Sequence, residues 1–208
     1  AAEAKNNIIE FLYNGKEIIM ARLNLSTGPE ERFFGMGERY SAMEYRGLRL
    51  DNYVFNQYRD QGVKTYIPCP FYISSAGYGL YLDSEAYSVF DFCGADPNRV
   101  SIEGYCGDSS YNIRLFIGCP KDILASYMRS TGCPELPPIW AFGPWMSSNN
   151  WDSQRKVLYQ MEMTKKHRIP ATVLVIEQWS DEATFYIFND AKYQLKDGSE
   201  RFCGSEFE

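Results

Sequence analysis

The sequence predicts an antiparallel β-sandwich over about its first two thirds, then the opening of a parallel α/β sheet, and three observations support this division. Many short β-type runs, separated by Gly, Asn and Asp clusters without helical patterns between them, are typical of a sandwich. The proline-rich segment 133–138 then predicts a stiff linker. An amphipathic helical pattern followed by a continuous apolar run indicates a βαβ unit beyond it. We therefore expect a sandwich domain at residues 1–133 and a second domain at residues 134–208.

The expected strands begin with a hairpin, in which residues 8–13 and 16–23 flank Asn14-Gly15. This dipeptide readily supplies two residues with positive φ for a tight turn. Further short runs carry the β-branched and aromatic residues typical of strands: 32–34, 71–74, 79–83, 88–92, 100–105 and 111–118. Their number and spacing favour two antiparallel sheets packed face to face.

A first helix is expected over residues 121–129, because Ile123, Leu124 and Tyr127 fall on one helical face. Pro120 suits the first position of a helix, and Gly132 can end one in the left-handed conformation.

The second domain is expected to contain a strand at 139–146, a helix at 152–168 and a strand at 171–176. Asn150 or Asp152 can cap that helix, and the basic residues 165–168 complement its dipole. The run 171–176 is apolar throughout, as expected of a strand buried on both faces of a parallel sheet. One βαβ unit cannot close a core, so we expect the chain to be an excerpt from a longer protein.

Composition excludes several classes of function. The chain has 21 Lys and Arg against 27 Asp and Glu, a net charge of −6, and no basic cluster, so nucleic acid is not an expected partner. No apolar run is long enough for a membrane-spanning helix, so no membrane partner is expected either. Aromatic residues make up 16% of the chain, which fits a β-rich core or flat apolar faces for a ligand.

The six cysteines include no C-x-x-C pair, and His167 is the single histidine, so neither a metal site nor another cofactor is expected. Reduced, mostly buried thiols are favoured over disulfides, with Cys93, Cys106 and Cys119 as buried small hydrophobes. The compartment stays open, with the cytoplasm slightly favoured. His167 falls in the last turn of the expected helix, where a surface role is favoured over catalysis.

Polar side chains gather at the expected carboxyl ends of the two parallel strands, residues 145–148 and 177–182. Ligands of α/β folds bind at such ends. Acidic groups beside Trp179 suit a sugar, because carboxylates accept from hydroxyls while an indole covers the apolar C–H face. The alternative, weighed equally, is that Trp179 belongs to the core and that Asp181 and Glu182 cap a following helix.

Two other motifs favour structural roles. Gly35-Met36-Gly37 lacks the third glycine and the helix of a dinucleotide-binding loop, so a close-packed strand or a bulge is the better interpretation. A series of tyrosines is dense enough to line a sugar-binding groove, although packing in and beside the sheets is favoured for most of them: Tyr40, Tyr45, Tyr53, Tyr58, Tyr66 and Tyr72.

Four segments resemble, in the expected order, motifs of glycoside hydrolase family 31. Residues 34–40, FGMGERY, resemble the F-G-x-G-E-R segment of the family, and residues 70–80, PFYISSAGYGL, resemble its P-F-Y-x-S-x-x-G-Y-G stretch. Residues 137–145, PPIWAFGPW, are similar to the segment that enters its first barrel strand. Residues 169–177, IPATVLVIE, resemble its second strand, I-P-x-x-V-x-x-x-D.

The resemblance implies a galactose-mutarotase-like β-sandwich followed by the first β/α units of a (β/α)₈ barrel. It also implies part of a retaining α-glycosidase that hydrolyses terminal α-linked glucose or xylose from oligosaccharides. The nucleophile and the acid/base of the family come from later barrel strands, so the resemblance assigns no catalytic residue here. It implies an oligosaccharide substrate and no cofactor, and it leaves a homo-oligomeric full-length enzyme open.

Substrate contacts can be carried over from the family. Glu177 occupies the position whose acidic residue binds sugar hydroxyls, although the family usually has Asp there. Trp145 and Trp179 stand beside the two expected strand ends and are further candidates for substrate binding. Asp51 and Asn52 match a sandwich loop that reaches over the same sugar in the family.

Two alternatives remain open from the sequence. One is a non-catalytic carbohydrate-binding β-sandwich protein, and the other is an α-glucan transglycosylase, which shares the motifs but transfers the sugar to an acceptor.

Overall fold

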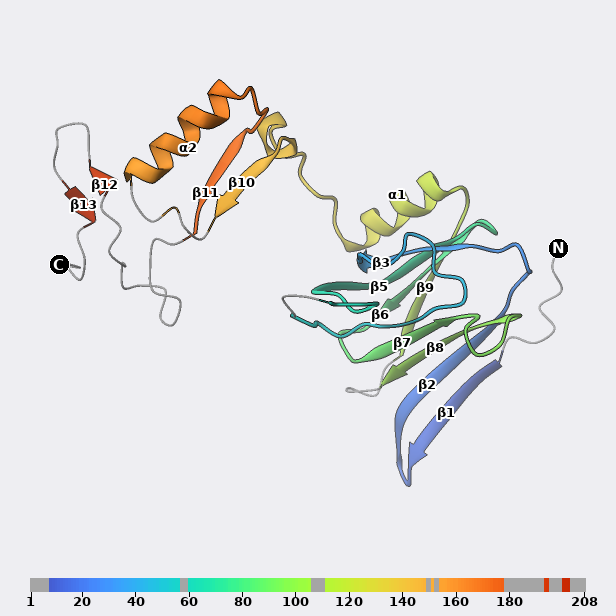
Figure 1. Ribbon diagram of the computed structural model, residues 1–208. Helices are drawn as coiled ribbons and strands as arrows, with labels where there is room; N and C mark the ends of the chain where they lie inside the picture. Colours follow the sequence, from blue (N-terminus) through green and yellow to red (C-terminus); the bar gives the residue numbers. More distant parts are fainter. Residues whose placement is uncertain are drawn as a thin grey trace. The chain divides into compact units, whose positions relative to one another are not determined.

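The computed structural model describes residues 8–56, 60–105, 111–148, 151, 154–177, 193–194 and 200–202. The chain divides into two compact units, Ala1–Pro134 and Glu135–Glu208 (Figure 1). Within the described residues, no helix combines the length and the apolarity that crossing a membrane requires.

The first unit is built from two antiparallel sheets, which confirms the predicted sandwich (Figure 1). One sheet has the order β1-β2-β8-β7-β4, with bounds Ile8–Asn14, Glu17–Ser26, Arg99–Tyr105, Ser88–Phe92 and Arg49–Asp51. The other has the order β3-β5-β6-β9, with bounds Phe33–Glu38, Ile67–Ser74, Tyr78–Asp83 and Asn112–Ile117. Both sheets turn alternate side chains toward each other, as amphipathic strands do.

Aromatic side chains fill the space between the two sheets. Phe33 stacks on Phe92 with ring centroids 5.1 Å apart, and Tyr72 meets Phe92 edge to face at the same distance. All three are fully buried. Part of the aromatic content is therefore core packing between the sheets, whereas other rings, such as Tyr40 and Tyr53, are exposed.

Helix α1 (Pro120–Thr131) covers the four-stranded sheet, against strands β6 and β9. Its Ile123 is fully buried, and its Tyr127 stacks on Phe71 with centroids 4.0 Å apart. Gly132 follows the helix with φ 113°, in the positive-φ region that favours glycine. The helix predicted over residues 121–129 is confirmed.

A bulge in β3 explains the two glycines at positions 35 and 37. The pairing of β3 with β5 shifts between Gly35 and Gly37, and the backbone has positive φ at Gly35, Met36 and Gly37. A Cβ atom on Gly35 would lie 2.7 Å from the carbonyl oxygen of Phe71, and one on Gly37 would collide with the backbone of β5 near Ile67. The interpretation as a close-packed bulge is confirmed.

The turn of the first hairpin differs from the prediction by one position. Asn14 is the last residue of β1 and pairs with Glu17, so Gly15 and Lys16 form the turn. Gly15 has φ 68°, whereas Asn14 stays in the strand, so the expectation of two positive-φ residues in Asn14-Gly15 is wrong. The pairing also shifts register between Leu12 and Tyr13, where Ile19 is the extra residue of a bulge on β2.

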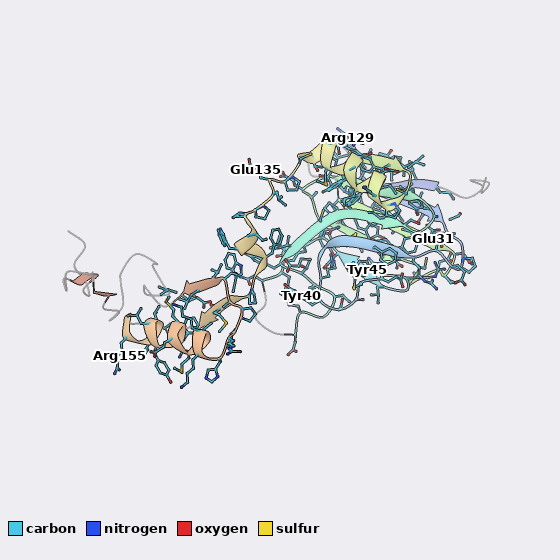
Figure 2. The ribbon with its side chains drawn as sticks, turned by 90° about the horizontal axis from the view of Figure 1, so that it is seen from above. Glu31, Tyr40, Tyr45, Arg129, Glu135 and Arg155 are labelled. Carbon is cyan, nitrogen blue, oxygen red and sulfur yellow. The ribbon has the colours of Figure 1, made fainter. Side chains whose placement is uncertain are left out.

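The second unit contains the expected βαβ unit. Strand β10 (Trp145–Ser148) pairs in parallel with β11 (Val173–Ile176), and helix α2 (Gln154–Lys166) connects them. Figure 1 shows α2 lying along the strand pair, and the exposed side chain of Arg155 marks the first turn of this helix in Figure 2. A two-stranded antiparallel pair follows, with bounds Tyr193–Gln194 (β12) and Glu200–Phe202 (β13). The predicted helix caps Asn150 and Asp152 lie outside the described residues.

Two details of this unit correct the sequence analysis. The strand predicted at 139–146 is wrong: Ile139–Phe142 forms a 3₁₀ helix, η1, and the strand begins only at Trp145, after Gly143-Pro144. The side chains of β11 are half-buried, and Ile176 is exposed, so the expected burial on both faces is not found.

The described cysteines are free: Cys69, Cys93, Cys119 and Cys133. Cys93 is buried as predicted, whereas the prediction of a buried Cys119 is wrong. Cys119 directly precedes α1 and is exposed to solvent, and its Sγ donates a hydrogen bond to the carboxylate of Asp122 at 3.0 Å. Cys133 is also exposed, on the linker, and Cys106 lies outside the described residues.

Candidate functional site

The parallel strand pair places Glu177 at a carboxyl edge. In the register of β10 and β11, Ser148 lies opposite Ile176, so both strands end at the same level. Glu177 follows directly and its side chain is exposed. The carboxyl ends of parallel strands are where α/β folds bind ligands. The structure therefore puts the predicted carboxylate where a ligand can reach it.

Trp145 lies at the other end of the same strand. It pairs with Val173, the first residue of β11, three positions before Ser148, or about 10 Å along the strand. Its indole Nε1 donates a hydrogen bond to the carbonyl oxygen of Ala141 at 3.1 Å. The structure does not bring Trp145 and Glu177 together, because the strand begins at Trp145 instead of ending there.

Trp151 is the tryptophan that the structure places just beyond the carboxyl end of β10. Its backbone N–H donates to the carbonyl oxygen of Ser148 at 3.3 Å, and the residue is 8% exposed. Sequence reasoning missed it, although a Trp three residues after a strand end was the available signal. Trp179, Asp181 and Glu182 lie outside the described residues.

Asp51 ends the edge strand β4 of the sandwich. It pairs with Val89 of β7 and is half-buried. Leu50 turns into the core, so Asp51 shares the outer face of the sheet with Arg49. A carboxylate on this outer face is accessible to a ligand from solvent.

Arg39 fixes the backbone at Asp51. Its Nη2 donates to the carbonyl oxygen of Asp51 at 2.6 Å, its Nη1 to that of Val63 at 2.5 Å and its Nε to that of Met36 at 2.9 Å. Burial lowers the pKa of Arg39, and the charges of Tyr45 and Asp51 oppose this shift. One side chain thus joins the β3 bulge, the end of β4 and the loop before β5.

Asn52 forms hydrogen bonds with the buried residue Ser88 of β7. Its backbone N–H donates to the carbonyl oxygen of Ser88 at 2.9 Å, and its Nδ2 donates to the Oγ of Ser88 at 3.1 Å. The buried Oδ1 has no hydrogen-bond partner among the described residues. Asn52 also lines a cavity of about 430 Å³ together with Pro68 and Asp83. Asp51 and Asn52 therefore face different environments, and the structure does not bring their side chains to one point.

The tyrosines named from the sequence divide between core and surface. Tyr45 and Tyr72 are buried, which confirms core packing for these two. Three others are exposed: Tyr40 by 70%, Tyr53 by 57% and Tyr66 by 53%. Tyr58 lies outside the described residues. His167 is exposed, as predicted, but it lies directly after α2 and not in its last turn. Among the described residues, no group of three or more His, Cys, Asp or Glu could hold a metal ion.

Family models match both units of the chain. Residues 11–91 match the glycosyl hydrolase 31 N-terminal galactose mutarotase-like domain, and residues 134–202 match the glycosyl hydrolases family 31 TIM-barrel domain.

Curated and solved relatives agree with these models. The chain is 40% identical to an isomaltosyltransferase of Sporosarcina globispora, over 97% of this chain and 19% of that protein. A cycloalternan-forming enzyme from Listeria monocytogenes, solved with a pentasaccharide substrate, superposes with a TM-score of 0.81 at 34% identity, over 95% of this chain and 20% of that one. A cycloalternan-degrading enzyme from Trueperella pyogenes gives 0.79 at 33% identity, over 90% of this chain and 28% of that one. The chain thus spans between 19% and 28% of the length of these relatives.

Proposed function

We propose, because the chain belongs to glycoside hydrolase family 31, that the whole protein is a retaining α-glycosidase that hydrolyses terminal α-linked glucose or xylose from oligosaccharides. This chain supplies its galactose-mutarotase-like sandwich and the start of its (β/α)₈ barrel. The observation that carries the proposal is Glu177, a solvent-accessible carboxylate at the carboxyl edge of the parallel pair β10–β11.

The role of this chain is to bind the sugar. Retention requires a carboxylate nucleophile and a carboxyl acid/base about 5–5.5 Å apart on either side of the anomeric carbon. Family resemblance assigns both groups to later barrel strands, so it assigns neither of them to this chain. Glu177 accepts hydrogen bonds from hydroxyls of the sugar and fixes its orientation, and Asp51 on the sandwich is a second carboxylate of this kind.

A panel of nitrophenyl α-glycosides tests the proposal on the full-length protein. We expect release of nitrophenol from the α-glucoside or the α-xyloside, with the α-anomer of the sugar formed first in the proton NMR spectrum. Release from neither substrate contradicts the proposal. First formation of the β-anomer would contradict retention.

A second candidate is an α-glucan transglycosylase. The observation that favours it is the 40% identity to an isomaltosyltransferase over nearly the whole of this chain. Incubation of the full-length protein with malto-oligosaccharides separates the two candidates. Products longer than the substrate indicate transfer, whereas glucose together with chains one residue shorter than the substrate, and no longer products, indicates hydrolysis.

The non-catalytic alternative makes a different prediction in the same assays. A carbohydrate-binding protein without catalytic carboxylates would retain oligosaccharides on a column while releasing neither nitrophenol nor transfer products.

A further inference from the structure

Three tyrosines form a row on the outer face of the five-stranded sheet. Tyr53 follows β4, Tyr87 precedes β7 and Tyr105 ends β8. The rings of Tyr53 and Tyr87 are 6.5 Å apart at an interplanar angle of 70°, and those of Tyr87 and Tyr105 are 5.4 Å apart at 49°. All three rings are 41–57% exposed. Alternation places them outside, because the intervening Leu50, Phe90 and Ile102 are fully buried in the core.

A polar hollow continues the row of rings along the same strands. Tyr87 stands two residues from Val89 and Tyr105 two residues from Glu103, and both of these partners line a cavity of about 350 Å³. That volume lies in the range of small-ligand sites, about 300–1,000 Å³. Its complete lining is Glu10, Arg22, Asn24, Arg49, Val89, Asp91, Ala95, Asp96, Arg99, Ser101 and Glu103.

The hollow has a closed floor and charged walls. Asn24, Val89 and Asp91 at its floor are 4–7% exposed, whereas the side chains of Arg22 and Arg49 are 37% and 59% exposed. Strands β2, β8, β7 and β4 thus form a trough that the long arginine side chains border. Small, buried side chains below and long ones at the sides are what a groove for an extended ligand requires.

Ion pairs hold the polar groups of the hollow in place. Glu103 accepts from Arg22 Nε at 3.0 Å and Nη2 at 2.8 Å, and from Arg49 Nη2 at 3.4 Å. Glu10 accepts from Asn24 Nδ2 at 3.0 Å and from Arg22 Nη1 at 3.3 Å. The guanidinium groups have further N–H donors, and the carboxylates have further acceptor sites. The hollow therefore offers pre-oriented donors and acceptors.

The same charged groups adjoin the tyrosine row. Burial raises the pKa of Tyr87, the charges of Asp51, Tyr105 and Glu103 act in the same direction, and Arg49 opposes them. Rings and ion pairs are therefore parts of one surface, the tyrosine face, defined as Tyr53, Tyr87 and Tyr105 with the lining of the hollow.

We propose that the tyrosine face binds a neutral saccharide chain. Tyrosine rings cover the apolar C–H faces of sugars, while guanidinium and carboxylate groups pair with the hydroxyls. A lining that mixes both signs of charge does not select an anion, and this excludes phosphorylated or nucleic-acid ligands on charge grounds. Protein partners are disfavoured because the centres of protein interfaces are depleted of charged side chains. The narrower choice of an α-glucan as the saccharide rests on the proposed function.

Native affinity electrophoresis of the full-length protein tests the tyrosine face, with glycogen or dextran cast in the gel. We expect at least one polysaccharide to retard the wild type. The double variant Tyr87→Ala, Tyr105→Ala should need about tenfold more polysaccharide for the same retardation. Tyr40→Ala is the matched control, because this exposed tyrosine follows β3 of the other sheet (Figure 2). The control should migrate like the wild type.

A second variant covers the case in which the double variant does not fold. Arg49→Gln removes one exposed guanidinium of the hollow, leaves Arg22 on Glu103, and should weaken retardation severalfold at unchanged melting temperature. Wild-type retardation of both variants overturns the proposal, as does a wild type that neither polysaccharide retards. Retardation does not require turnover, so a retained but inactive protein would contradict the proposed function and support the tyrosine face. An active protein that neither polysaccharide retards would support the proposed function and contradict the tyrosine face.

Discussion

Glu177 carries a longer side chain than the aspartate that family resemblance leads one to expect at the end of the second barrel strand. Its position at the carboxyl edge is fixed by the register of β11 with β10, whereas its carboxylate has one more rotatable bond. The added methylene places the acceptor oxygens farther from the backbone. In the proposed sugar site, the carboxylate of Glu177 therefore reaches farther from the end of β11 than an aspartate would.

Replacement of Glu177 by Gln in the full-length enzyme should lower kcat/KM for a nitrophenyl α-glycoside. A charge-assisted hydrogen bond is worth about 1.5–3 kcal/mol, which corresponds to about a ten- to hundredfold loss. Glu162→Gln provides the control, because Glu162 is an exposed carboxylate on α2 of the same unit. Kinetics of the Glu177→Gln variant within twofold of wild type would remove Glu177 from the sugar site.

Arg39 makes a second prediction at the residue scale. Its planar guanidinium donates to three carbonyl oxygens from separate segments, and a lysine ammonium cannot reproduce that fork. Arg39→Lys should lower the free energy of unfolding by about 2–3 kcal/mol, measured by urea denaturation. The exposed Arg129 on α1, labelled in Figure 2, supplies the control Arg129→Lys, which should change stability by less than about 0.5 kcal/mol. Equal stabilities of the two variants would contradict a clamping role for Arg39.

At the scale of elements, strands with strong alternation were predictable and short or irregular ones were not. Strand β4 has three residues with one apolar side chain, and its pairing with β7 is supplied by the tertiary fold. The start of β5 contains Pro68 and Pro70, which normally argue against a strand. The glycines of β3 announced a bulge, but only the partner strand shows that the strand continues through it to Glu38.

Helix α1 provides a test of packing at the element scale. Ile123 is fully buried, whereas its neighbour Leu124 is 46% exposed. Comparing an alanine substitution at each position therefore separates the effect of burial from that of helix propensity. Ile123→Ala should lower the free energy of unfolding by about 2–4 kcal/mol, because it leaves a cavity between α1 and the sheet. Leu124→Ala should cost less than about 1 kcal/mol in the same urea titration. A larger loss for Leu124→Ala would show that α1 packs through a different face.

At the scale of the whole molecule, the change from alternating to helical periodicity near residue 120 predicted both architectures. The sequence also placed Glu177 at a strand end, because a continuous apolar run stops directly before it. The sequence did not show that β10 begins at Trp145. The residues Ile139–Phe142 before it are equally apolar but form a 3₁₀ helix. The sequence also could not show that Asp51 and Asn52 face different sides, which depends on the pairing of β4 with β7.

The stability of the sandwich should fall at alkaline pH, because two tyrosines are enclosed in it. Burial raises the pKa of Tyr72 well above its ordinary value, and burial also raises that of Tyr78. Above about pH 10 the unfolded chain releases these phenolic protons while the folded chain retains them, which favours unfolding. This part of the free energy of unfolding is therefore complete below about pH 10 and is lost as the pH rises towards the folded-state pKa values.

Urea titrations of the 208-residue chain between pH 8.5 and 11 measure this effect. Tyr72→Phe should give a shallower decline in the free energy of unfolding than the wild type, because one enclosed proton no longer distinguishes the two states. Tyr66→Phe, at a ring that is 53% exposed, is the matched control and should follow the wild type. Identical declines for Tyr72→Phe and the wild type would refute the assignment.

Strands β10 and β11 pair without a register shift, so the number of residues in β11 decides to which face of the strand pair the Glu177 side chain points. Successive side chains of a strand point to opposite sides. Insertion of one residue into β11 would keep the acidic residue at the carboxyl end of the strand but turn its side chain to the opposite face of the strand pair. Insertion of two residues would return the side chain to its original face. Insertions in β11 can therefore change which groups this carboxylate contacts, without replacement of the carboxylate itself.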